Sequence, residues 1–285
     1  MAAAARLILL TGATGFVGRQ VLRDLARRGC KVRVVVRPTV DNARAALAAL
    51  APADAIESVV TTADLWSESA AWYAEACRGV DTVIHAAWYA EPGLYLHSPK
   101  NADCEQGTLR LAQGAAAAGV LRFAGIGTCF EYDTSGGTLR TTTPLRPHTP
   151  YGAAKAATFL ALSQLLPRDE VEFVWCRLFY LHGEGEDPRR LMPVLRDKLA
   201  AGEPAELGSG TQVRDYLDVR DAARMIVDAA LGSVQGPVNI CSGRAVTIRQ
   251  IAERIADEYG RRDLLRFGAR PDNPADPPCI VGVRD

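Results

Sequence analysis

The sequence predicts an α/β protein of the doubly wound type, in which helices cover both faces of a parallel sheet. Three observations support this class. Short apolar or β-branched runs alternate with helical stretches over residues 1–178, a glycine-rich turn joins the first run to the first helix, and the composition suits a large core. Of the 285 residues, 48% are hydrophobic and 23% are charged, which is typical of a globular chain.

Six short runs have the composition of strands buried on both faces, because apolar and β-branched side chains dominate them. Helical stretches with one apolar face separate the runs. The expected strands are residues 6–11, 31–36, 57–62, 81–87, 122–128 and 172–179, and the clearest expected helices are 16–28, about 105–118 and 150–166.

The regular alternation of strands and helices ends after residue 178. Loops lengthen, and glycine, proline and charged residues become more frequent. We therefore expect a nucleotide-binding domain over 1–178, to which part of 218–242 returns, and a smaller substrate-binding region over most of 179–285.

Charge and cysteine usage exclude several classes of function. Lysine and arginine balance aspartate and glutamate at 33 each and form no block, which argues against nucleic acid or an anionic membrane as partner. Seven dispersed cysteines predict reduced thiols in a cytoplasmic protein, and the isolated histidines predict no metal site. The apolar run near the start is too short to span a membrane.

The first turn carries three glycines at a spacing of three, in the sequence LLTGATGFVGRQ. Glycine permits a tight turn and lets a pyrophosphate approach the backbone, where the amides at the helix start face the anion. This Rossmann-type arrangement predicts a dinucleotide, and the alternative is a glycine-rich turn without a ligand. The residues expected at the cofactor are Gly12, Thr14, Gly15, Phe16, Val17 and Gly18.

The end of the second strand distinguishes between NAD and NADP. An NAD site places a carboxylate there for the ribose, whereas an arginine can take the 2′-phosphate. The sequence VVVRPT places Arg37 at this point, which favours NADP(H). The alternatives are a solvated arginine and NAD(H) as cofactor. Asp64 and Leu65, after the third strand, are expected beside the adenine.

The stretch TPYGAAK opens the helix at 150–166. Thr149 can cap this helix and Pro150 suits its first position. Tyr151 and Lys155 are four residues apart and share a face, where the ammonium and the helix start are expected to lower the pKa of the phenol. The alternative is a solvated helix face.

The chain resembles the extended short-chain dehydrogenases/reductases, the group of nucleotide-sugar epimerases and dehydratases. The motifs that carry this resemblance follow the family's order over nearly the whole chain. They are TGATGFVG, VIHAAW, Thr128 with Tyr151 and Lys155, Tyr132, RLFYLHGEG, GSGTQVRDYLDVRDAA, and NICSG with TIRQIAERI.

The resemblance implies a role for each matched residue. Tyr151 would be the general acid/base, Lys155 would hold the nicotinamide ribose, and Thr128 would position the reacting sugar oxygen. Arg214 would meet the substrate diphosphate, with pairing to Asp215 or Asp218 as the alternative. Ala86 and Ala87 are expected at the cofactor, and the other residues expected at the substrate are Trp88, Tyr89, Cys129, Tyr180 and Arg189, with Arg190 as the alternative to Arg189.

Departures from the family narrow the expected reaction. The family's sugar dehydratases carry an Asp-Glu pair after the catalytic threonine, where this chain has Cys129 and Phe130, so 4,6-dehydration is not expected. Cys129 is expected to be a packed thiol, with a part in the chemistry as the alternative. Glu131 is expected to point elsewhere, with a role as an auxiliary group as the alternative. Trp88 and Tyr89 could pack under a loop.

These features together predict an NADPH-dependent 4-ketoreductase of a nucleotide-activated keto-deoxysugar, a hexose or a heptose. The alternatives are an NAD-dependent nucleotide-sugar epimerase, a reductase of small non-sugar ketones, and a non-catalytic NADP-sensing module. The resemblance also implies a homodimer built on the helices near 105–118 and 150–166.

Overall fold

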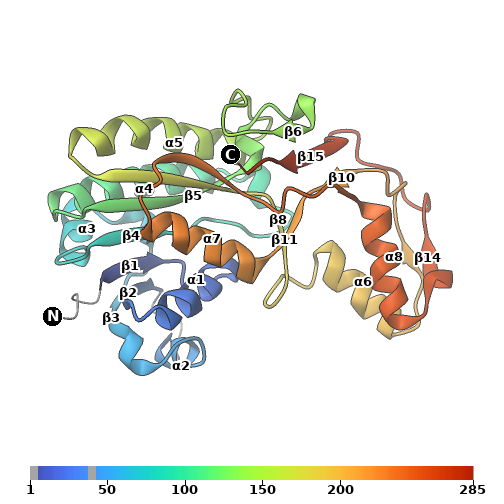
Figure 1. Ribbon diagram of the computed structural model, residues 1–285, viewed down its shortest axis with the longest axis horizontal. Helices are drawn as coiled ribbons and strands as arrows, with labels where there is room; N and C mark the ends of the chain where they lie inside the picture. The colour runs from blue at the N-terminus through green and yellow to red at the C-terminus, as the bar shows by residue number, and fades with distance from the viewer. Residues whose placement is uncertain (1–5, 38–42, 285) are drawn as a thin grey trace.

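A seven-stranded parallel sheet forms the centre of the molecule (Figure 1). The computed structural model describes residues 6–37 and 43–284. The strand order is β12-β7-β5-β4-β1-β2-β3, and every neighbouring pair is parallel. The strands are β1 (Leu7–Thr11), β2 (Lys31–Val36), β3 (Ile56–Thr61), β4 (Thr82–His85), β5 (Arg122–Thr128), β7 (Glu172–Leu178) and β12 (Gly236–Ile240).

Helices cover both faces of this sheet, as the doubly wound class requires. On one face α1 (Phe16–Arg27) packs beside α7 (Val219–Leu231), and α2 (Ala43–Ala48) lies near the sheet edge. The other face carries α3 (Ala70–Ala76), α4 (Lys100–Ala117) and α5 (Pro150–Arg168). The chain order reverses between β1 and β4, which places a ligand crevice at the carboxyl ends of these two strands.

The expected strands are all present, with small differences at their ends, and α1 and α5 begin at their expected residues. The helix α4 begins at Lys100, earlier than expected. Near its start it buries Asn101 and Cys104 rather than large apolar side chains. Both of these residues are buried. Polar packing of this kind leaves no hydrophobic periodicity in the sequence.

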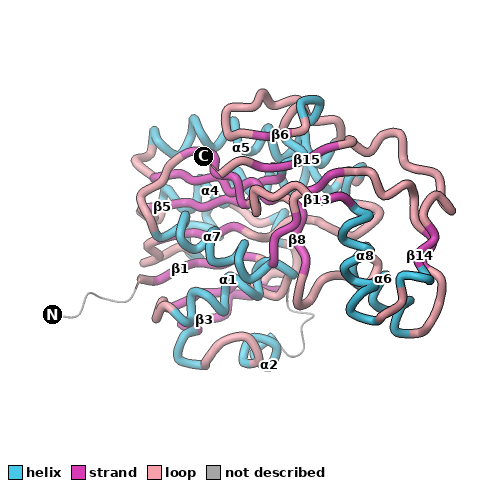
Figure 2. Tube along the Cα trace, turned by 45° about the vertical axis from the view of Figure 1, so that its right-hand side comes forward, coloured by secondary structure: helices cyan, strands magenta, loops and turns pink. Residues whose placement is uncertain are grey.

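A smaller group of elements lies beside the carboxyl ends of the strands, and Figure 2 shows it on the right of the sheet. Its core forms between α6 (Leu191–Ala200) and α8 (Ile248–Tyr259). The short strands of this region and its border are β6 (Thr138–Leu139), β8 (Tyr180–His182), β9 (Ala205–Glu206), β10 (Val213–Arg214), β11 (Tyr216–Asp218), β13 (Val246–Thr247), β14 (Leu265–Arg266) and β15 (Cys279–Gly282). The chain returns to the central sheet through α7 and β12.

One buried carboxylate joins three distant segments at the border of the two groups. Asp215 is fully buried and accepts hydrogen bonds from the backbone amides of Ser242, Gly243 and Gly282, at 2.7, 2.8 and 3.2 Å. The hydroxyl of Ser242 also donates to it, at 2.6 Å. The loop after β12 and the strand β15 are thereby held against β10. Within the described ranges, none of the helices has the length and apolar character needed to cross a membrane.

Candidate active site

The glycine turn between β1 and α1 is packed too closely for side chains at two of its three glycines. Gly12 has a φ of +72°, and a Cβ there would lie 2.7 Å from the amide nitrogen of Ala87. A Cβ on Gly18 would lie 2.0 Å from the carbonyl oxygen of Gly12. The turn therefore rests with Gly12 directly against the segment that follows β4.

The start of α1 is open to an anion. Its N-cap residue is Gly15, which has no side chain to cap the amides of Phe16, Val17 and Gly18. The carbonyl of Thr14 accepts a hydrogen bond from Arg19 at 3.0 Å, which fixes the loop next to the helix. A backbone cradle at a helix N-terminus is the arrangement that binds a pyrophosphate, so these residues fit the dinucleotide expected from the sequence.

Buried hydrogen bonds fix the end of β4 beside this turn. The ring nitrogens of His85 lie 2.8 Å from the hydroxyl of Thr11 and 2.9 Å from that of Thr108. Burial lowers the pKa of His85 to about 3, so the ring is neutral. Thr11 also accepts from the amide of Ala87 at 3.2 Å. The segment of Ala86 and Ala87 is thereby held against Gly12.

The residues expected at the adenine end of the cofactor, Arg37 and Asp64, follow β2 and β3. Arg37 is exposed directly after β2. Arg33, on the same strand, instead pairs with Glu57 at 3.1 Å and donates to the carbonyls of Ala76 and Arg78, so it braces the sheet. Asp64 follows β3, where its exposed side chain caps the turn η2 (Leu65–Ser67) by accepting from Trp66 at 3.0 Å.

Tyr151 lies in the first turn of α5, where two aromatic rings flank it. Thr149 caps the helix by accepting from the amide of Gly152 at 3.2 Å. The ring of Tyr95 meets Tyr151 edge-to-face with centroids 4.8 Å apart, and the ring of Trp88 does so at 6.4 Å. Trp88 directly follows Ala87, so the phenol lies close to the segment that supports the glycine turn.

The surroundings of Tyr151 raise the pKa of its phenol. Burial is the largest cause, the nearby Tyr95 acts in the same direction, and a hydrogen bond with the Thr128 side chain opposes both. The expectation of a lowered pKa is therefore wrong. The structure keeps Tyr151 protonated at neutral pH and able to give a proton away.

Lys155 is buried beneath Trp88. Its ammonium donates to the carbonyl of Ile126 at 2.5 Å and lies 3.6 Å from the centroid of the Trp88 ring. Only 3% of the residue is exposed, and burial lowers the pKa of the ammonium, while Glu131 and Cys104 act in the opposite direction. Lys155 and Tyr151 thus share Trp88 as a neighbour.

Thr128 ends β5 and is fixed by the residues that follow it. Its hydroxyl accepts from the amide of Phe130 at 3.3 Å, and its own amide donates to the carboxylate of Glu131 at 2.8 Å. Glu131 is fully buried, pairs with Arg177 at 2.6 Å and accepts from the indole of Trp175 at 2.9 Å. Glu131 is therefore held in the core by Trp175 and Arg177.

Three of the residues expected at the substrate lie together beyond Thr128. Cys129 is 2% exposed and packs in a small apolar cluster with Phe130 and Tyr180, which supports the alternative of a packed thiol. The guanidinium of Arg214 lies 5.3 Å from the ring centroid of Tyr180. Arg214 is itself 2% exposed and forms an ion pair of 2.6 Å with Asp276.

Arg214 pairs with neither Asp215 nor Asp218, which are the expected partners if it does not bind a diphosphate. Asp215 receives amide and hydroxyl donors of its own, and Asp218 caps α7 and pairs with Arg220. The partner of Arg214 comes instead from the segment before β15. Because Asp276 lies far along the chain, the local sequence around Arg214 carries no sign of this contact.

Two residues expected at the substrate already have charged partners within the protein. Arg189 is exposed and pairs with Asp187 and Glu91, both at 2.8 Å, so carboxylates of the protein already neutralise it. Its neighbour Arg190 hydrogen-bonds Tyr95. The ring of Tyr89 faces the ammonium of Lys100 at 4.8 Å. Of the two adjacent arginines, Arg190 is thus the one that contacts Tyr95, and Trp88 is the one of the two adjacent aromatic residues that contacts Tyr151.

Tyr95 and Asn101 are the residues of this site that sequence reasoning misses. Tyr95 lies in the turn η3 (Tyr95–His97), and Asn101 lies in the first turn of α4. Neither belongs to a motif. Their position in the loop and helix after VIHAAW is the signal that could have found them.

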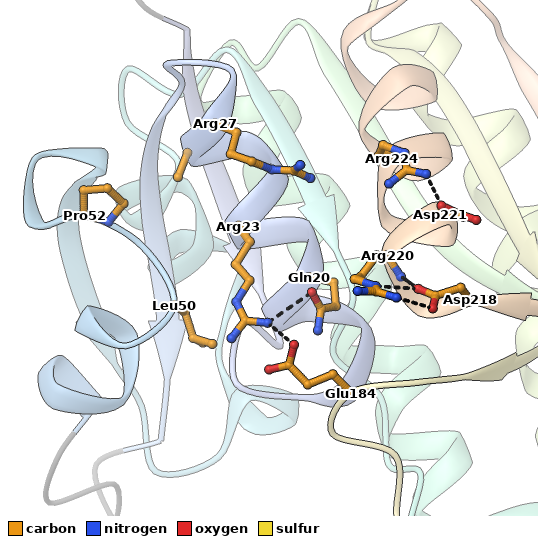
Figure 3. A pocket seen from close by; sticks show the side chains of 11 residues that line it. Gln20, Arg23, Arg27, Leu50, Pro52, Glu184, Asp218, Arg220, Asp221 and Arg224 are labelled. Atoms are coloured by element: carbon orange, nitrogen blue, oxygen red, sulfur yellow. Dashed lines mark hydrogen bonds and ion pairs between the residues drawn. The ribbon is translucent and has the colours of Figure 1, made fainter. Parts of the chain in front are cut away.

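A cavity of about 720 Å³ lies apart from these residues, between α1, the loop after α2 and α7 (Figure 3). Its arginines are paired within the protein: Arg23 with Glu184 at 2.7 Å, and Arg220 with Asp218 at 2.8 Å. None of the residues expected to bind cofactor or substrate, or to take part in catalysis, lines this cavity. In the described part of the chain, no cluster of three or more histidine, cysteine or acidic residues could hold a metal ion.

The profile of the NAD-dependent epimerase/dehydratase family matches residues 8–241, which include the glycine turn, Thr128, Tyr151 and Lys155. The chain belongs to this family. The family is dependent on a nicotinamide cofactor by its description, in agreement with the cradle at Gly12 and Gly18.

Relatives can be aligned with nearly the whole length of this chain. It is 22% identical to dTDP-6-deoxy-L-talose 4-dehydrogenase (NAD(+)) of Aggregatibacter actinomycetemcomitans, covering 97% of this chain and 99% of the relative. It is 25% identical to dTDP-4-dehydro-6-deoxy-D-allose reductase of Streptomyces bikiniensis, covering 93% and 84%. The structure of DesIV, a dTDP-glucose 4,6-dehydratase from Streptomyces venezuelae with NAD bound, superposes with a TM-score of 0.80 at 25% identity, covering 98% and 88%.

Proposed function

We propose that this family member is an NADPH-dependent 4-ketoreductase of a nucleotide-activated 6-deoxyhexose. The observation that carries the proposal is the environment of Tyr151, a half-buried residue whose phenol pKa is raised by desolvation and which lies close to the segment supporting the cofactor turn. A group in this state suits the protonation of a carbonyl oxygen during reduction.

The cofactor would lie along the carboxyl ends of β1 and β4. Gly12, Gly15 and Gly18 would admit its pyrophosphate, Ala86 and Ala87 would line its path, and Asp64 with Leu65 would reach the adenine. When bound, a reduced nicotinamide supplies the hydride for the substrate carbonyl. Arg37 would contact a 2′-phosphate, which supports NADP(H) rather than NAD(H).

The proton would come from Tyr151. Thr128 hydrogen-bonds the phenol and would direct it, together with the substrate oxygen, into line for transfer. Lys155 would turn from the carbonyl of Ile126 toward the nicotinamide ribose and place a positive charge near the oxygen that receives the proton. A charge there would stabilise a developing alkoxide.

The residues after Thr128 support reduction rather than dehydration. Cys129 is buried as a thiol whose pKa burial raises to about 12, and Phe130 has no titratable group. Glu131 is occupied by Arg177 and Trp175. The chain therefore offers no free acid and base at this point for an elimination.

Arg214, Tyr180 and the named relatives support a nucleotide sugar as substrate. A guanidinium binds diphosphate oxygens well, and the aromatic ring beside it offers a surface for a sugar or a base. Two relatives are named for oxidation or reduction of dTDP-linked 6-deoxyhexoses, so a thymidine diphosphate sugar is the first substrate to test. An NAD-dependent epimerase is the second candidate, supported by the family description.

The decisive experiment mixes the purified protein with a dTDP-4-keto-6-deoxyhexose and either NADPH or NADH, and follows absorbance at 340 nm with mass spectrometry of the sugar. The proposal expects stoichiometric consumption of NADPH and a product two hydrogen atoms heavier. Isomerisation of a dTDP- or UDP-hexose without net consumption of cofactor would establish the epimerase instead.

Two further expectations belong to this proposal. We infer a cytoplasmic homodimer that pairs α4 and α5 with those of a second copy, supported by the exposure of Leu160 on α5 at 54%. Light scattering at micromolar concentration tests it. A monomeric mass for the protein would rule the dimer out, and a dimer that survives Leu160→Glu would place the interface elsewhere.

A further inference from the structure

A buried asparagine joins the two aromatic residues that flank Tyr151. Asn101 is 2% exposed, in the first turn of α4. Its side-chain oxygen accepts from the indole nitrogen of Trp88 at 2.9 Å. Its side-chain nitrogen donates to the carbonyl of Tyr95 at 2.7 Å and to that of Ser98 at 2.9 Å.

These three hydrogen bonds permit one orientation of the Asn101 amide. Both of its N–H groups and its oxygen are in use, so a rotation by half a turn would place donor against donor. The amide therefore fixes the indole of Trp88 and the backbone of η3 relative to each other. A side chain without this pair of functions cannot hold both.

The indole held by Asn101 covers Lys155. The ammonium lies 3.6 Å from the Trp88 ring centroid and 5.7 Å from that of Trp175. The titratable groups that face it are the carboxylate of Glu131, the thiol of Cys104 and the neutral ring of His85. The face of an indole attracts a cation, most strongly where water is excluded.

We infer that Asn101 is a positioning residue, which holds the indole of Trp88 across the Lys155 ammonium and the phenol of Tyr95 against Tyr151. This inference deepens the proposed function and rests on it for the role of Lys155 in turnover. Asn101 itself touches none of the reacting groups; it acts through the two rings.

Replacement of Asn101 by leucine should lower the pKa of Lys155. The indole loses its acceptor and turns, so the ammonium loses the ring face that favours its charged form. Burial already lowers the pKa of Lys155, and this loss lowers it further. Lys155 then loses its proton at a lower pH, by about one pH unit for a desolvated cation–π contact.

The test uses tryptophan fluorescence of the whole protein without substrate or cofactor. In each variant, the contribution of Trp88 is the difference in fluorescence between the protein that has Trp88 and the same protein with Trp88→Phe. This difference is measured from pH 5 to 10. We expect one step in this difference, which is absent in Lys155→Met and moves down by about one pH unit in Asn101→Leu. A step at the same pH in Asn101→Leu and in the unchanged protein would overturn the inference.

A matched variant separates positioning from folding. Asn239 is also a buried amide, at 5% exposure, and bonds Tyr132 and two backbone carbonyls away from Lys155. Asn239→Leu should lower the melting temperature and leave the fluorescence step in place. A shift of the step in Asn239→Leu as large as that in Asn101→Leu would show a general effect of destabilisation and refute the inference.

If Asn101→Leu does not fold, Trp88→Phe keeps the inference testable through the pH profile of kcat. A phenylalanine ring has no N–H for Asn101 to hold, so the alkaline limb should move to lower pH; an unmoved limb would contradict the inference. Because the fluorescence titration needs no turnover, its result stands even if the protein reduces no keto-sugar, and in that case only the proposed function fails.

Discussion

Arg214 and Asp276 form an ion pair of 2.6 Å in which the guanidinium is almost completely buried and the carboxylate remains partly exposed. The two residues come from neighbouring elements, since Arg214 ends β10 and Asp276 precedes β15, which pairs with β10 in parallel. The carboxylate thus occupies one of the positions from which an anionic ligand could reach Arg214.

Asp276→Asn is expected to strengthen binding of a nucleotide sugar. A diphosphate must compete with Asp276 for the guanidinium, and an amide competes less well than a carboxylate. We expect KM for the sugar nucleotide to fall by about threefold to tenfold with little change in kcat. Asp263→Asn, which alters an exposed pair with Arg261, is the control. An unchanged KM would show that the diphosphate does not use Arg214.

Tyr151→Phe should remove the proton donor without removing the ring. We expect kcat to fall by about 10²–10⁴-fold, because general acid catalysis contributes that much, while the dissociation constant of NADPH stays unchanged. Tyr259→Phe, near the protein surface at the end of α8, should keep full activity. Full activity of Tyr151→Phe would assign the protonation to another group.

Arg37→Ser tests the choice of cofactor. If Arg37 binds a 2′-phosphate, kcat/KM with NADPH should fall by about 10–100-fold and kcat/KM with NADH should hardly change. The matched change Arg33→Ser should instead lower the melting temperature, because Arg33 pairs with Glu57 and bonds two backbone carbonyls. A preference for NADH in the unchanged protein would already refute the NADP assignment.

Glu131→Gln should destabilise the protein more than it affects the chemistry. The substitution leaves the guanidinium of Arg177, which is 1% exposed, without its buried counter-charge. Loss of one member of such a pair costs about 3–5 kcal/mol of unfolding free energy, measured by urea denaturation. The partly exposed pair of Glu253 with Arg249 offers a control, and Glu253→Gln should change stability by about 1 kcal/mol or less.

His85 predicts how stability depends on pH. Its pKa in the folded protein is about 3, below the ordinary value of 6.5, so the unfolded chain takes up the proton first. The stabilisation is complete above pH 6.5 and is lost as pH falls toward 3. When the pH falls from 7 to 5, the free energy of unfolding should drop by about 2 kcal/mol more in the unchanged protein than in the His85→Gln variant. Denaturant titration at the two pH values measures both drops. Equal losses would mean that His85 is charged in the fold.

The sequence predicts the frame of the site well, because local patterns determine it. The strands are continuous apolar runs, and the glycines of the first turn and the cap at Thr149 act on their immediate neighbours. The parts that the sequence does not predict depend on contacts between distant residues. Asp276 reaches Arg214 through the pairing of β10 with β15, and the pKa of the Tyr151 phenol is raised by desolvation and by the nearby Tyr95, which is distant in the sequence.

The sequence also does not predict which of two adjacent arginines, Arg189 or Arg190, reaches the site. Both residues precede α6, and their side-chain directions depend on the turn before that helix. Arg189 meets Asp187 and Glu91, whereas Arg190 reaches Tyr95. Sequence proximity alone does not distinguish two adjacent arginines.

The hydrogen bonds of Asp215 have a practical consequence for anyone who shortens or extends this chain. The amide of Gly282 is one of the donors that keep this carboxylate satisfied, so removal of residues 282–284 would leave a buried charge short of a partner beside Arg214. Loss or displacement of β15 should therefore damage ligand recognition before it unfolds the sheet.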